Sequence, residues 1–232
     1  GAKCLVVFVD TYSRYTYCDV IHRKCDVVNS LKKFRQNVGT PRELYCDWGT
    51  EFCGAFAKHC FENGIRIQHS APYSAFSNGV VERKNQSLKR AMRRMLLDAG
   101  LPDQFWGRAA LTAAHLLNRR YSSYTPDYTP YELMWGVKPD VSNIRAFGSV
   151  CYPLVQPASK RIGAPKIASS VGIMVGYSDE SAGVVVWDPI KKNLKICRDV
   201  ALDENWRFST SAAPIPLSTP NPALSYSMTP PH

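Results

Sequence analysis

The sequence predicts an α/β protein in which a mixed sheet is flanked by helices and followed by a small β-barrel. Strand-like runs alternate with helical patterns through the first half of the chain, which is typical of a sheet covered by helices. After about residue 146, short strand-like runs separated by turns take over, which favours a barrel. With 232 residues and 45% hydrophobic content, the chain is long enough for one core domain and a small second domain.

The first strands and helices follow from apolar spacing. The alternating or continuous apolar runs indicate strands, and apolar residues three and four apart, as in 27–34, indicate an amphipathic helix. Gly39-Thr40-Pro41 stops that helix. The predicted elements are an antiparallel strand pair at 4–9 and 15–21, a helix at 27–34, a strand at 43–46, a helix at 54–62 and a strand at 65–69.

A turn-rich stretch, 71–79, precedes two longer helices. The first is predicted from about Val80 to Ala99, because Gly100 and Pro102 provide a stop signal. The second spans 104–118 and presents an apolar packing face. The barrel strands are then predicted at 148–155, 171–177, 183–187 and 193–198. The domain prediction is a core at 1–145, a barrel at 146–206 and a Pro/Ser-rich disordered tail at 207–232.

Composition points to a polyanionic partner. The chain has 29 basic and 19 acidic residues, a formal charge of +10 and a pI of about 9.3, which attracts nucleic acid; a merely solvated basic surface is the alternative. No apolar run is long enough to span a membrane, so no membrane partner is expected. The eight cysteines form no CxxC pair, and the spacing of the Cys and His residues does not favour structural zinc.

Two acids are candidates for a metal site. Asp47 follows a predicted strand, and Glu82 lies in the first turn of the predicted helix 80–99, with 34 residues between them. Two carboxylates that meet in one cleft repel each other, and a divalent cation relieves that repulsion. Surface acids are the alternative that this spacing alone leaves open.

The surroundings of Glu82 favour a DNA-binding helix. Residues Asn78, Glu82 and Gln86 recur four apart, and Lys89 and Arg93 continue the same face. Between residues 83 and 120, nine basic residues stand against two acidic ones, and phosphate backbone is the partner that such a balance suits. The predicted DNA-binding residues are Asn78, Arg83, Lys84, Gln86, Lys89, Arg90 and Arg93.

Several motifs resemble copia-type (Ty1/copia) retrotransposon integrases. The core motifs are Val9-Asp10-Thr11-Tyr12-Ser13-Arg14, Asp47-Trp48-Gly49-Thr50-Glu51-Phe52 and Asn78-Gly79-Val80-Val81-Glu82-Arg83-Lys84-Asn85. Later segments resemble the family in the same order, among them Leu101 to Trp106, Asn118-Arg119, Thr129 to Glu132, Lys138 to Asp140 and Arg145 to Gly148. Gly176-Tyr177-Ser178 and Arg198-Asp199-Val200 are similar to its SH3-like barrel.

The resemblance implies an RNase H-like core, Mg²⁺ or Mn²⁺, and polynucleotidyl transfer. In that reaction element DNA ends are trimmed and the new 3′-hydroxyl attacks target DNA. Asp47 and Glu82 match the second and third catalytic carboxylates, and Asn78, Gln86 and Lys89 fall where related integrases contact DNA. The resemblance also implies a homo-oligomer, an origin in a Gag-Pol polyprotein, and a location in virus-like particles and the nucleus.

The sequence departs from the family pattern at three points. The first catalytic Asp is expected on a strand before Cys4, in a His-x-Asp-x-x-Gly-Pro segment that is not in this sequence. Asp10 ends the next strand and is a poor substitute, and a triad of Asp10, Asp47 and Glu82 is the alternative. Trp48 replaces the usual Asn, and the interval to Glu82 is one residue short. The His/Cys zinc domain is also absent. Two hypotheses stay open: an integrase truncated from a longer polyprotein, and a catalytically inactive DNA-binding remnant.

Overall fold

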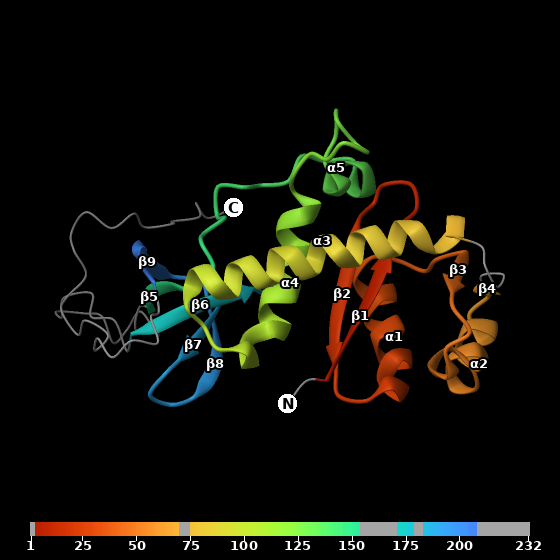
Figure 1. Cartoon of the computed structure of the whole chain (residues 1–232), viewed down its shortest axis with the longest axis horizontal. Helices are drawn as coiled ribbons and strands as arrows, with labels where there is room; N and C mark the ends of the chain where they lie inside the picture. Colours follow the sequence, from red (N-terminus) through yellow and green to blue (C-terminus); the bar gives the residue numbers. More distant parts are fainter. Residues whose placement is uncertain (1–2, 70–74, 154–170, 179–182, 208–232) are drawn as a thin grey trace. The chain divides into compact units, whose positions relative to one another are not determined.

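The computed structural model describes residues 3–69, 75–153, 171–178 and 183–207 (Figure 1). The predicted tail lies beyond these residues except for Arg207. In this described part, no helix combines the length and apolar character needed to cross a membrane.

The chain begins with an antiparallel hairpin, as predicted. Strand β1 (Cys4–Val9) pairs with β2 (Thr16–Ile21) in a register that opposes Val9 to Thr16. The backbone N–H of Asp10 donates to Tyr15 O at 2.9 Å and that of Arg14 donates to Asp10 O at 3.0 Å, which closes the loop. Arg14 takes a positive φ of 61°, an uncommon conformation for a residue with a side chain.

A parallel strand pair follows the hairpin. A short 3-10 turn, η1 (Lys24–Asp26), leads into helix α1 (Val27–Asn37), and strand β3 (Glu43–Cys46) follows. Turn η2 (Thr50–Phe52) and helix α2 (Ala55–Glu62) then connect β3 to β4 (Arg66–His69). The register of β3 and β4 sets Cys46 beside His69.

One apolar core unites the two strand pairs. Leu31 of α1 and Phe56 of α2 are fully buried, and Phe8 of β1, Leu44 of β3 and Ile67 of β4 pack against the same cluster. The predicted mixed sheet is therefore present as two two-stranded pieces over a shared core. In the described residues, β1 pairs only with β2 and β3 only with β4.

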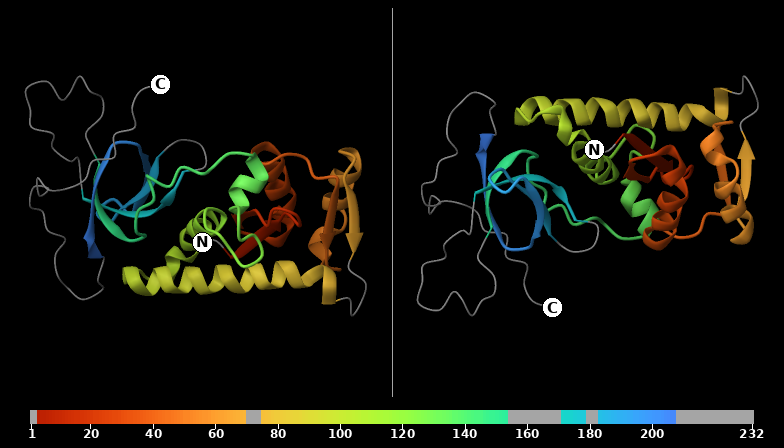
Figure 2. Two further views of the ribbon diagram at one scale, coloured as in Figure 1. Left: turned by 90° about the horizontal axis from the view of Figure 1, so that it is seen from above. Right: turned by 90° about the horizontal axis from the view of Figure 1, so that it is seen from below.

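Two long helices follow the strand pairs. Helix α3 (Ala75–Ala99) runs without a break in both views of Figure 2 and starts five residues before its predicted beginning, within the stretch that was predicted to be turn-rich. It ends at Ala99, and Gly100 follows with a φ of 63°. Turn η3 (Asp103–Phe105) and helix α4 (Trp106–Asn118) come next.

A short helix, α5 (Pro130–Trp135), was not predicted. Its signals are nevertheless local: the Thr129 side chain accepts a hydrogen bond from Glu132 N at 3.1 Å, and the Glu132 carboxylate accepts one from Thr129 N at 2.8 Å. This reciprocal pair is a capping box, and Pro130 and Gly136 begin and end the helix.

The C-terminal part is a five-stranded antiparallel sheet in the order β8-β7-β6-β5-β9. Strand β9 lies outside the predicted set, because the predicted strands ended at Arg198. It pairs with β5, with an irregular register between Ser149 and Val150. The strands are β5 (Ser149–Pro153), β6 (Gly172–Tyr177), β7 (Val184–Asp188), β8 (Asn193–Cys197) and β9 (Val200–Arg207).

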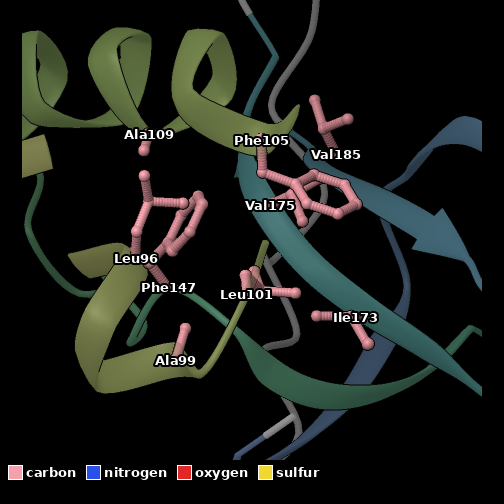
Figure 3. Close-up of a cluster of buried hydrophobic side chains, with 9 residues drawn as sticks. All are labelled: Leu96, Ala99, Leu101, Phe105, Ala109, Phe147, Ile173, Val175 and Val185. Carbon is pink, nitrogen blue, oxygen red and sulfur yellow. The ribbon is translucent and has the colours of Figure 1, made fainter. Parts of the chain in front are cut away.

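The structure divides into two compact units. One holds residues 1–90 and 116–139, and the other holds residues 91–115 and the chain from Asp140 onward. In the second unit, Leu96 of α3 and Phe105 beside α4 join Ile173, Val175 and Val185 of the sheet in one buried cluster (Figure 3). This sheet therefore shares its core with the ends of two helices.

Candidate functional site

Asp47 lies directly after β3 on an exposed loop. Its Oδ1 accepts a hydrogen bond from Gly49 N at 3.0 Å, which fixes the turn that follows the strand. No described residue hydrogen-bonds its other carboxylate oxygen, which leaves a hard oxygen donor facing solvent. A hard oxygen donor is the ligand type that Mg²⁺ and Mn²⁺ prefer.

A second carboxylate converges on the same turn. A Cβ built on Gly49 would lie 2.9 Å from Asp47 Oδ1 and 2.9 Å from Glu51 Oε2, so the two carboxylates lie within twice that distance of each other. A side chain at position 49 would have to push one of these carboxylates aside. Glu51 also faces Lys24, whose Nζ lies 3.7 Å from Glu51 Oε1. Glu51 belongs to the motif that begins at Asp47, and no role in the site was predicted for it.

The loop after β3 is fixed by His69 of β4. The His69 ring stacks on Trp48 with centroids 4.3 Å apart, and its Nδ1 lies 3.2 Å from Asp47 O. Burial, and then the negative charge of Asp47, raise the pKa of the Cys46 thiol to about 11. Cys46 therefore stays protonated near neutral pH and offers no thiolate to a metal ion.

Asp10 has a different role. Its Oδ2 accepts hydrogen bonds from both the backbone N–H and the hydroxyl of Ser13, each at 2.7 Å. These bonds hold the β1–β2 loop closed. One oxygen of the Asp10 carboxylate is thus engaged by its own turn.

Glu82 is exposed on α3. Because the helix begins at Ala75, Glu82 is its eighth residue, so the prediction that it lies in the first turn was wrong. Gln86 and Lys89 follow at helical spacing and are also exposed, and Arg93 lies one further turn along. Among the described residues, no group of three or more His, Cys, Asp or Glu side chains is placed to hold a metal ion.

The other predicted DNA-binding residues divide into two groups. Arg83 and Arg90 are exposed, as phosphate contacts require. Lys84 is half-buried, and its pKa is lowered first by burial and then by the positive charges of Arg120 and Arg14. Lys84 thus lies among other cations inside the first unit. The backbone of Asn78 belongs to α3, and its side chain is outside the described residues.

The comparisons with known proteins fit this arrangement. The integrase core domain family matches residues 1–75, and the retroviral polymerase SH3-like domain family matches residues 149–214. The retrovirus-related Pol polyprotein from transposon TNT 1-94 of Nicotiana tabacum is 32% identical over 211 residues, which cover 88% of this chain and 16% of that polyprotein. The retrovirus-related Pol polyprotein from transposon RE1 of Arabidopsis thaliana is 28% identical over 208 residues, which cover 86% of this chain and 14% of that polyprotein.

The chain thus spans about a sixth of the length of these relatives. Among solved structures, a chain of the simian T-cell lymphotropic virus intasome in complex with PP2A regulatory subunit B56 gamma matches with a TM-score of 0.50 and 20% identity, over 83% of this chain and 69% of that one. The HTLV-2 integrase catalytic core domain in complex with magnesium matches with a TM-score of 0.48 and 24% identity, over 56% of this chain and 84% of that one.

These matches define the class: an RNase H-like integrase core followed by an SH3-like domain. The plant retrotransposon polyproteins then identify the group of integrases within this class, because the similarity to them extends through both domains. The chain belongs to the integrases of copia-type retrotransposons.

Proposed function

We propose that this chain is the DNA-handling part of a retrotransposon integrase. It binds element DNA ends and target DNA, and with a complete set of catalytic carboxylates it trims the 3′ ends and transfers them to target DNA. The observation that carries this proposal is the exposed face of α3, on which Glu82 shares helical spacing with Gln86 and Lys89. An acid on a basic helix suits chemistry at a phosphodiester.

Asp47 and Glu82 are the residues that would hold Mg²⁺ or Mn²⁺. Both are exposed carboxylates, and one oxygen of Asp47 has no hydrogen-bond partner in the described part of the chain. A divalent ion held there would activate the attacking oxygen and stabilise the leaving one. The basic side chains of α3 would position the DNA backbone, since phosphate contacts fix the register and orientation of a duplex.

A catalytically inactive DNA-binding remnant is the second candidate function. The observation that favours it is that two carboxylates, Asp47 and Glu82, match the catalytic set, while Asp10 uses one of its oxygens to hold Ser13. The upstream coding sequence separates the two candidates. An in-frame His-x-Asp-x-x-Gly-Pro segment supports the enzyme, and a reading frame without one supports the remnant.

Strand transfer is the biochemical test. We expect no Mn²⁺-dependent transfer from residues 1–232 alone. A chain extended upstream through that segment should transfer a labelled element end, and Glu82→Gln should abolish the activity while Glu62→Gln, an exposed acid on α2, leaves it intact. Transfer by residues 1–232 that is lost on Asp10→Asn would overturn our assignment of Asp10.

The same proposal covers assembly and place of action. We infer that the integrase works as a homo-oligomer on DNA, in virus-like particles and then in the nucleus. Sedimentation of the chain with and without duplex DNA tests the first part: a monomer under both conditions counts against it.

A further inference from the structure

The β1–β2 loop presents an arginine that an aromatic ring covers. The guanidinium carbon of Arg14 lies 3.7 Å from the centroid of the Tyr124 ring, which is cation–π geometry. The loop is well fixed, because Arg14 N donates to Asp10 O and Asp10 holds Ser13. The guanidinium is therefore held in place before any ligand arrives.

Two nitrogens of this guanidinium are left without partners. Arg14 Nε and Nη1 are buried and have no hydrogen-bond partner within the described part of the chain. Buried polar atoms are nearly always satisfied, so unpaired charged donors need an explanation such as an absent ligand. A guanidinium presents its donors as a planar fork that matches the oxygens of a phosphate.

Lys84 lies within electrostatic reach of both Arg14 and Arg120. Lys84 enters from α3 and is half-buried, and Arg120 follows the end of α4 and is exposed. The charges of Arg120 and Arg14 act on Lys84 together with its burial. Within the described residues, none of these three cations forms an ion pair with an acid. Crowded like charges disfavour one another, and an anion between them removes that penalty.

The partner of Arg14 stands on a structured turn. Thr125 N donates to Ser122 O at 3.1 Å, and the hydroxyls of the two residues lie 3.0 Å apart. Tyr124, between them, is 64% exposed, and Tyr121 and Tyr128 on either side are also exposed. Basic groups interleaved with exposed aromatic rings are typical of surfaces that contact a nucleic-acid strand.

We propose that Arg14, Lys84 and Arg120 form a phosphate site that binds the DNA backbone, a second contact in addition to the Glu82 face of α3. Lys84 is two residues from Glu82, so helical geometry turns the two side chains about 200° apart around the helix axis. A DNA duplex that lies along a single face of α3 therefore cannot contact both residues. That the phosphate belongs to DNA rests on the proposed function. The existence of the anion site does not depend on it.

Salt-dependent DNA binding tests the site. Each lost phosphate contact lowers the slope of log K against log salt by about 0.9 for a duplex. We expect Arg120→Gln and Lys84→Gln each to lower the slope by about that amount and to weaken binding several-fold. Arg14→Asn should do the same, because Asn tolerates the positive φ. The matched control is Lys58→Gln, an exposed cation on α2 that faces Glu62 at 4.0 Å and should leave the slope unchanged.

Inorganic phosphate provides a readout that does not need DNA. Titrated into the wild-type chain, it should shift the NMR signal of Arg14 Nε–H and raise the pKa of Lys84, and both responses should disappear in Arg120→Gln. A wild-type chain that responds to phosphate but binds no DNA would contradict the proposed function and keep the anion site. The site would be overturned if the Arg14, Lys84 and Arg120 variants bind DNA with the same salt slope as Lys58→Gln and the wild-type chain does not respond to phosphate. If an acidic peptide competes for this site as strongly as DNA of equal charge, the assignment of the ligand to DNA would be overturned.

Discussion

The carboxamide of Asn118 pairs with the backbone of Thr16 as a neighbouring strand would. Asn118 Oδ1 accepts from Thr16 N at 2.9 Å, and Asn118 Nδ2 donates to Thr16 O at 2.8 Å. Both residues are buried. The end of α4 is thereby joined to the start of β2, next to the loop that holds Arg14.

Asn118→Ala should therefore be costly. It leaves a buried N–H and a buried C=O of Thr16 without partners, and we expect the free energy of unfolding to fall by roughly 2–4 kcal/mol. Denaturation in urea measures this. Asn37→Ala is the control, because Asn37 is exposed and its amide donates only to surface groups, Lys33 O and the Tyr17 hydroxyl, among the described residues, so its loss should be below about 1 kcal/mol. Equal losses for the two variants would contradict the role of Asn118.

Gly148 should not accept a side chain. Its φ is 84°, and a Cβ there would overlap the Cβ of Ala99 within the same unit. We expect Gly148→Ala to destabilise the fold by about 3 kcal/mol, through backbone strain and overpacking together. Gly136→Ala isolates the strain, since its φ is 72° but the space around it is open; a loss of about 1 kcal/mol is expected. Thermal unfolding that ranks the two variants the other way would refute this.

The second unit should lose stability in acid through Asp188. Burial alone would raise the pKa of Asp188, but N–H groups of Lys191 and Ile190 and the Lys195 ammonium, 2.9 Å away, bring the pKa down to about 2. The folded pKa lies below the unfolded value near 3.9, so this stabilisation is complete above pH 4 and is lost as the pH falls toward 2.

Asp188→Asn should remove that part of the acid dependence. It should also lower stability at pH 7 by roughly 2–3 kcal/mol, because charge-assisted hydrogen bonds to a buried carboxylate are lost. Urea denaturation at several pH values measures both effects. Asp127→Asn, at an exposed position, should leave the curve between pH 2 and 4 as in the wild type. If the Asp188→Asn variant keeps the wild-type dependence of stability on pH, Asp188 is not the cause of that dependence.

Local pattern was enough to predict most of the fold. Strands β1 and β3 and the ends of α3 and α4 agree with the sequence prediction, because apolar spacing and the Gly100 stop are local signals. The start of α3 was missed because Gly79 and its polar neighbours are typical of a turn, although a helix tolerates one glycine at a cost of about 1 kcal/mol. Strand β9 was missed because its pairing with β5 is a long-range contact.

The candidate site was less accessible from sequence. Asp47 and the face of Glu82 could be predicted, because each depends on the end of one strand or the spacing of one helix. The convergence of Glu51 on Gly49 depends on the geometry of one turn. The grouping of Arg14 with Lys84 and Arg120 depends on three segments far apart in the chain, and no spacing rule brings such residues together.

DNA binding by α3 tests the central claim most directly. The chain should bind duplex DNA at low salt, with log K falling linearly against log salt. Lys89→Gln combined with Arg90→Gln, both at exposed positions, should reduce that slope by nearly two, and Lys58→Gln should not change it. Fluorescence anisotropy across a salt series gives the slopes. Absence of binding, or binding that does not respond to salt, would contradict the account.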